Sequence, residues 1–177
     1  LYRLLAERDG IAADPAVGYL NIPGDLGKIG LEEASWSPDE LLSALRETET
    51  VSPHLHVPLQ SGDDGVLRAM GRRYTAGAFL RRLERAEGLN LTTDVIAGFP
   101  GEDERAFART LETIERAGIT RVHVFPYSPR PGTRTRAEDT VPPEVKRERS
   151  ARLRAASREA CLRAWRAKVG REDVVLV

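Results

Sequence analysis

Polar side chains that could do chemistry fall at the ends of the predicted β-strands. Glu33, Gln60 and Asp94 stand at three such ends, and a Gly-Phe-Pro-Gly turn at 98–101 follows Asp94 closely. Carboxylates and amides suit the hydroxyl groups of a ribose, and a turn containing glycine lets the backbone approach a flat base. Arg72, just after a predicted helix, offers a guanidinium that can hold a carboxylate with two hydrogen bonds. These residue types together suit a nucleoside that carries an amino-acid tail.

Four β-prone segments are expected to position these residues. They span 28–33, 53–60, 91–97 and 121–127, and helix-forming segments separate them. Strands that alternate with helices form parallel sheets through right-handed crossovers, with helices on the outer side. We therefore expect an α/β fold, half of a β/α barrel or a similar curved sheet. Ligand sites in such sheets lie at the carboxyl ends of the strands, where Tyr127 joins the residues named above.

Capping signals mark where the helices begin and end. Ser37 lies just before Pro38 and three residues before Glu40, which is a typical helix N-terminus. Asp63 or Asp64 and then Thr75 are predicted to begin two further helices, and residues 103–117 a third. The glycines predicted to end these helices are Gly71, Gly88 and Gly118.

A long helix rich in arginine is predicted from about Pro142 to Lys168. Residues 144–168 hold nine Lys or Arg and three Glu, and the chain from Arg130 onward carries a net charge of +6 against −6 for residues 1–129. This asymmetry favours contact with a polyanion, although an amphipathic helix with solvated arginines predicts the same pattern. The predicted apolar stripe of the helix consists of Leu153, Ala156, Ala160, Cys161, Ala164 and Trp165.

The composition indicates an ordinary globular domain. The 177 residues are 41% hydrophobic and 31% charged, values typical of soluble proteins. Apolar runs are too short for a transmembrane helix, and residues 1–8 are too charged for a signal peptide, so a cytoplasmic location is expected. The chain begins with Leu1, and residues 171–177 read as a strand that has only begun, so we expect a piece of a longer protein.

Cysteine and histidine offer few metal ligands. The single cysteine, Cys161, excludes an internal disulfide and any cluster held by several cysteines of this chain, and it is expected to be a small buried residue. His54 and His56 lie two apart on a strand and face the same side, which is compatible with a metal site. They have no acidic or cysteine partner at ligand spacing, so packing or hydrogen bonding is the preferred interpretation, as for the lone His123.

Three stretches of the chain carry a longer pattern: HLHVPLQSGDDGVLRAMGRRYT at 54–75, LTTDVIAGFPGE at 91–102 and HVFPYSPRPGT at 123–133. Together they resemble consecutive segments of the radical S-adenosylmethionine methylthiotransferases. The resemblance implies a set of residues that contact S-adenosylmethionine: Glu33, Gln60, Ser61, Arg72, Asp94, Gly98 and Pro100. It assigns the methionine carboxylate to Arg72, with Arg73 as the near alternative. It places Tyr127 and Arg130 at the substrate mouth.

The same resemblance implies a reaction that this chain cannot perform alone. Family members hold a 4Fe-4S cluster on a Cys-x3-Cys-x2-Cys loop, where electrons from a donor drive the cleavage of S-adenosylmethionine. A second 4Fe-4S cluster in an N-terminal domain delivers sulfur. Neither set of cysteines is present, so we expect no catalytic residue in this chain and no activity of the chain by itself. The oligomeric state stays open.

The resemblance divides the chain into four parts. Residues 1–27 match poorly, and residues 28–141 correspond to the C-terminal half of the radical S-adenosylmethionine barrel. Residues 142–169 are the basic helix. Residues 170–177 resemble the first strand of a truncated RNA-binding β-barrel of the TRAM type.

The implied acceptor is a modified adenosine at position 37 of a tRNA. HVFPYSPRPGT, HLHVPLQSG and KRERS at 146–150 most resemble the branch that acts on threonylcarbamoyladenosine. The isopentenyladenosine branch and the branch that modifies an aspartate of a ribosomal protein are alternatives. A non-catalytic nucleotide-binding or RNA-binding module is an alternative from another class, and a relative of coproporphyrinogen dehydrogenase is a third. Sequence upstream of Leu1 would decide between them.

Overall fold

The structure is a computed structural model that describes residues 20–21, 30–31, 38–47, 52–129, 135, 139 and 141–172. These residues belong to two units, one within residues 1–51 and the other within residues 52–177, and each is described by itself.

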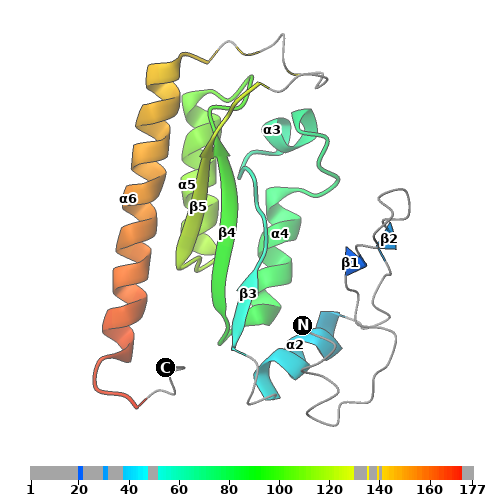
Figure 1. Cartoon of the computed structure of the whole chain (residues 1–177), viewed down its shortest axis with the longest axis vertical. Coiled ribbons are helices and arrows are strands. Elements are labelled where there is room, and N and C mark those ends of the chain that lie inside the picture. Colours follow the sequence, from blue (N-terminus) through cyan, green and yellow to red (C-terminus); the bar gives the residue numbers. More distant parts are fainter. Residues whose placement is uncertain are drawn as a thin grey trace. The chain divides into compact units, whose positions relative to one another are not determined.

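A parallel three-stranded sheet forms the centre of the larger unit (Figure 1). Its strands are β3 (His54–His56), β4 (Asn90–Ala97) and β5 (Arg121–Pro126), in the order β3-β4-β5. The register aligns Asp94 of β4 with His123 of β5. Neighbours in the chain are therefore neighbours in the sheet, which confirms the predicted parallel crossovers.

Helices connect and cover these strands. They are α3 (Asp64–Ala69), α4 (Ala76–Leu83), α5 (Glu104–Arg116) and α6 (Pro143–Lys168), with a 3-10 turn η2 (Glu84–Ala86) after α4. The side chains of Asp63, Thr75 and Asp103 each accept a hydrogen bond from a backbone N–H of the first turn. The three glycines predicted to end the helices all have positive φ angles.

The core lies between β4 and the helices. Leu91, Val95 and Ala97 alternate along β4 with their side chains buried, and Leu67 and Phe107 are fully buried among the helices. The alternate residues of β4 share the other face of the sheet, which therefore carries the polar side chains.

Helix α6 runs along β5 and next to α5 (Figure 1). The backbone N–H of Val122 in β5 donates to Ser157 Oγ of α6 at 2.9 Å, so a serine takes the place that a further strand would occupy at this point. Cys161, which was expected to be buried, lies further along the same helix and is only half-buried.

The predicted apolar stripe of α6 is wrong at its ends. The residues that α6 buries are Lys146, Arg149, Ser150, Leu153 and Ser157. Trp165, which was predicted on that stripe, is 63% exposed. The prediction failed because it assigned all basic residues to solvent, whereas two of them meet acidic partners inside the fold.

The smaller unit contains α2 (Pro38–Glu47), which confirms the helix predicted after Ser37. It also contains β1 (Leu20–Asn21) and β2 (Gly30–Leu31), which pair antiparallel. The strand predicted over 28–33 is present at Gly30–Leu31, but its expected parallel pairing was wrong. It pairs with Leu20–Asn21, which lies inside the segment 11–25 predicted as a loop. Segments so close in sequence can pair antiparallel without a long crossover.

Some predicted features lie outside the described residues: the helix in 1–10, Glu33, Arg130 and residues 173–177 of the final strand. Among the described helices, none combines the length and the apolar character needed to cross a membrane.

Candidate functional site

A cavity of about 390 Å³ opens at the carboxyl ends of β4 and β5. Gln60, Asp94 and Tyr127, three of the residues predicted from the sequence, line it together with Ile96 and Phe99. The volume is within the usual range of small-molecule sites, and the lining mixes apolar rings with a few polar groups, as such sites do.

Gln60 enters the cavity from a strained backbone. Its φ is +66°, the left-handed region that residues other than glycine rarely adopt. Two hydrogen bonds hold it there, from Gln60 N–H to the Asp94 carbonyl at 2.8 Å and from Ile96 N–H to the Gln60 carbonyl at 3.0 Å. Strain that the surrounding structure maintains is typical of functional sites.

Asp94 faces the polar side of the sheet, where it contacts a histidine. Its Oδ2 lies 3.3 Å from His56 Nε2, and the other ring nitrogen, Nδ1, lies 2.9 Å from Thr92 Oγ1. The His56 ring meets the His123 ring edge-on at 5.7 Å. These contacts confirm the hydrogen-bonding interpretation of His56. In the described part of the chain, no three metal-ligating side chains come together.

The turn at 98–101 contributes Phe99 to the cavity lining. Phe99 packs edge-on against Tyr127, with ring centroids 5.1 Å apart, and the Tyr127 hydroxyl donates to the Thr135 carbonyl at 3.1 Å. Gly98 N–H donates to Glu102 Oε2 at 2.8 Å, which closes the turn. Phe99 lies in the turn predicted to approach the base, although it was not named as a contact residue. Ile96 was not predicted, although the period of two from Asp94 places it on the same face.

A buried ion pair behind this turn was also not predicted. Arg149 of α6 donates to the Glu102 carbonyl at 2.9 Å and to Glu102 Oε2 at 2.8 Å, and the two side chains are only 6% and 1% exposed. Burial raises the pKa of Glu102, while the Gly98 N–H and the Arg149 charge act in the opposite direction. No local sequence signal joins residues so far apart.

Four predicted cofactor residues do not line the cavity: Ser61, Arg72, Gly98 and Pro100. Ser61 is fully buried, accepts a hydrogen bond from Asp63 N–H at 3.2 Å and lies 3.4 Å from Thr110 Oγ1 of α5. Arg72 is exposed just after α3 and does not line the cavity. Burial raises the pKa of the nearby Tyr74, against the opposing charge of Arg72, and the Tyr74 hydroxyl donates to the Leu59 carbonyl directly before Gln60.

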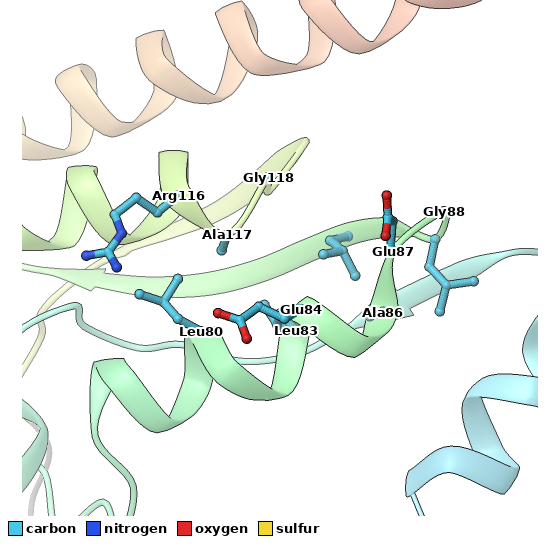
Figure 2. Close-up of a pocket in the computed structure, with 11 residues that line it drawn as sticks. Leu80, Leu83, Glu84, Ala86, Glu87, Gly88, Arg116, Ala117 and Gly118 are labelled. Carbon is cyan, nitrogen blue, oxygen red and sulfur yellow. The ribbon is translucent and has the colours of Figure 1, made fainter.

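A second hollow, of about 450 Å³, lies at the opposite, amino end of β4. Figure 2 shows Leu80, Leu83 and Glu84 on one wall and Arg116 with Ala117 of the α5 end on the other. It contains no residue predicted for chemistry, and ligand sites of parallel sheets lie at the other end of the strands. The cavity at Gln60 is therefore the candidate site.

The comparison with protein families agrees with this architecture, a parallel β/α sheet with a cavity at the carboxyl ends of its strands. The chain belongs to the Radical SAM superfamily, whose family model matches residues 14–131.

Curated relatives narrow the family. The chain is 38% identical over 164 residues to the threonylcarbamoyladenosine tRNA methylthiotransferase of Thermotoga maritima, covering 88% of this chain and 37% of that protein. It is 36% identical to a tRNA-2-methylthio-N(6)-dimethylallyladenosine synthase of Mycobacterium marinum (93% of this chain, 35% of the relative) and 43% identical to that of Acidothermus cellulolyticus (78% and 29%). These names confirm the resemblance to methylthiotransferases. The chain spans about a third of the length of these relatives.

Among solved structures, coproporphyrinogen III oxidase of Escherichia coli, described as a radical SAM enzyme, has a TM-score of 0.57. It is 22% identical in sequence, and the match covers 71% of this chain and 30% of that one. This likeness concerns the fold alone, and it agrees with the predicted partial barrel.

Proposed function

We propose that this chain is part of a tRNA methylthiotransferase and that its cavity holds S-adenosylmethionine beside threonylcarbamoyladenosine at position 37 of a tRNA. The observation that supports this most directly is the cavity lined by Gln60, Asp94 and Tyr127, in a chain 38% identical to a protein named for that activity. The proposed substrate also implies a location in the cytoplasm.

The cavity lining fits S-adenosylmethionine by its chemistry. The Gln60 amide and the Asp94 carboxylate can accept hydrogen bonds from ribose hydroxyls, and Ile96 and Phe99 offer apolar surface to a flat base. Arg72 is proposed to hold the methionine carboxylate, and Tyr127 lies where the substrate would enter. When bound, S-adenosylmethionine would supply the methyl group and the radical, while these residues bind it, orient it and exclude water.

Iron–sulfur clusters do not fit this chain. A 4Fe-4S cluster takes several thiolate ligands, and the sequence has one cysteine, Cys161, which lies on α6. We therefore assign no step through a cluster to these residues. The proposal is that other parts of a longer protein hold the two clusters and meet the electron donor, and that this chain is inactive alone.

Helix α6 is the proposed tRNA-facing element. Arg147, Arg154 and Arg158 are exposed, and their spacing of seven and four residues places them on one face of the helix. Arginines aligned in this way neutralise phosphates without reading sequence.

The activity can be tested by mass spectrometry of tRNA nucleosides from a strain that lacks the complete gene. We expect the loss of 2-methylthio-threonylcarbamoyladenosine and its return when the complete gene is restored. Loss of the methylthiolated dimethylallyladenosine instead would support the second candidate, which the 43% identical relatives favour. Unchanged tRNA nucleosides would reject both.

A further inference from the structure

We propose that Arg149 of α6 is a positioning residue for S-adenosylmethionine binding, because it holds the turn of residues 98–102 in the shape that presents Phe99 to the cavity. This inference rests on the proposed function.

Arg149 contacts the turn through Glu102, and Arg149 itself does not line the cavity. Its Nη1 donates both to the backbone carbonyl and to Oε2 of Glu102, and the same Oε2 accepts the N–H of Gly98. One carboxylate oxygen thus joins the first residue of the turn to α6. Phe99 lies between these two anchored residues and packs edge-on against Tyr127.

A second basic residue of α6 supports the same turn. A Cβ added to Gly98 would lie 2.5 Å from Lys146 Cγ, so the lysine stem fills the space beside the glycine. The Lys146 ammonium pairs with Asp139 at 2.6 Å and lies 5.1 Å from the centre of the Tyr127 ring. The first turns of α6 therefore form a layer directly behind the cavity wall.

The pair of Glu102 and Arg149 is poorly explained as a stabilising contact alone. Glu102 Oε1 and Arg149 Nε are buried and have no hydrogen-bond partner in the described part of the chain. A buried ion pair with unsatisfied atoms is often no more stable than apolar residues of the same volume. The pair does, however, fix the orientation of the turn relative to α6, because its hydrogen bonds are directional.

Arg152 provides a matched control one helical turn away. Both guanidinium groups lie over the Phe107 ring, at 5.5 Å for Arg149 and 4.6 Å for Arg152. Arg152 pairs with the exposed Glu104 at 2.7 Å, which Arg149 approaches only to 3.8 Å, and in the described part of the chain Arg152 forms no hydrogen bond or ion pair with Glu102 or Gly98. Replacing Arg152 removes a similar charge and ring contact without releasing the turn.

The test compares Arg149→Met, Arg149→Lys and Arg152→Met in the complete, anaerobically prepared protein. Equilibrium dialysis with S-adenosylmethionine is done at a temperature where circular dichroism shows each variant folded. We expect Arg149→Met to bind about tenfold more weakly or worse, Arg149→Lys to bind more weakly despite keeping the charge, and Arg152→Met to bind like the wild type.

The outcomes separate this inference from the proposed function. If the wild-type protein does not bind S-adenosylmethionine, the proposed function fails. If it binds and the Arg149 and Arg152 variants bind equally, the positioning role is overturned. Should Arg149→Met not fold, Arg149→Lys decides, and unchanged affinity in that folded variant overturns the inference.

Discussion

Gln60 keeps a backbone conformation that glycine would adopt at lower cost. A residue with a side chain at a φ of +66° pays on the order of 1 kcal/mol or more, yet this one stands on the cavity wall. The backbone hydrogen bonds to Asp94 and Ile96 explain how the strain persists. They do not explain why a glutamine is present, which favours a role for its amide.

Two substitutions separate the strain from the amide. Gln60→Gly and Gln60→Ala both remove the side-chain amide, so each is expected to weaken S-adenosylmethionine binding by the complete protein about tenfold, as for one lost hydrogen bond. Gln60→Gly should be more stable than Gln60→Ala by about 1 kcal/mol in denaturant unfolding, because glycine tolerates positive φ. Equal stabilities would contradict the strain, and unchanged binding would contradict the role of the amide.

Arg72→Ala is expected to weaken S-adenosylmethionine binding by about 1.5–3 kcal/mol in calorimetry on the complete protein, since the methionine carboxylate would lose its guanidinium partner. Arg73→Ala, which removes the adjacent exposed arginine, is the matched control. A loss confined to Arg73→Ala would transfer the role to that residue. Equal binding by both variants and the wild type would remove the carboxylate role from this segment.

Asp63 ties the stability of α3 to pH. Burial acts to raise the pKa of its carboxyl, but the Val66 N–H and the Arg109 side chain at 2.6 Å together bring it below the ordinary value of 3.8. A lowered folded-state pKa means that the ionised cap stabilises fully above 3.8 and that this contribution is lost as pH falls further. In the Asp63→Asn variant, the free energy of unfolding should therefore fall less steeply with decreasing pH below 3.8 than in the wild type. An equally steep fall in both proteins would contradict this.

Much of the site was predictable at this scale. Gln60 and Tyr127 follow from their positions at the ends of predicted strands, since a parallel sheet brings such ends together. Asp94 lies within β4, and its place on the polar face follows from the alternation of side chains along the strand. The pair of Glu102 and Arg149 was not predictable, because 47 residues separate its partners and nothing local joins them. The φ of Gln60 is likewise set by its contacts with β4 and not by its own residue type.

The bounds of helix α6 were predicted correctly from the sequence, but the face that it buries was not. Pro142 and the helix-forming residues after it mark its start clearly. Its buried face could not be read from hydrophobicity, because Lys146, Arg149 and two serines occupy it alongside Leu153. Polar residues can be buried where hydrogen-bond or ion-pair partners are present, and here those partners belong to other elements of the fold.

The two buried serines of α6 make a paired test of this idea. Ser157→Ala removes the acceptor of the Val122 N–H and should destabilise the fold by about 1–3 kcal/mol. Ser150→Ala removes a buried hydroxyl without a partner in the described residues, so it should be neutral or stabilising. Chemical denaturation of both variants checks the difference. Equal losses of unfolding free energy in the two variants would show that the hydrogen bond to Val122 does not distinguish Ser157 from Ser150.

At the scale of the whole chain, the neutral net charge conceals an acidic part, residues 1–129, and a basic part, residues 130–177. The basic C-terminal part divides again in the structure, since some basic residues of α6 hold the fold while others are exposed. A count of arginines in the sequence could not make that division. The parallel sheet was predictable from the rhythm of strands and helices, whereas the antiparallel pair β1 and β2 was not, because very short strands leave little pattern.

The exposed arginines of α6 are predicted to bind the phosphates of tRNA. Replacing Arg147, Arg154 and Arg158 together by glutamine should weaken tRNA binding by the complete protein and reduce the slope of log affinity against log salt by about 2–3. Arg81→Gln with Arg82→Gln, on the exposed surface of α4, is the control and should leave the slope unchanged. Filter binding over a range of salt concentrations checks both. An unchanged slope in the triple variant would reject the role of α6.

The hydrogen bond between Val122 and Ser157 has a consequence for measuring motion. Val122 lies on the outer strand of the described sheet, and its amide proton is shielded by a side chain of α6. If α6 moves away, that proton becomes open to exchange with deuterium while the pairing of β5 with β4 can remain intact. The exchange rate of this one amide therefore reports how often α6 leaves the sheet, in the unaltered protein and with any ligand added.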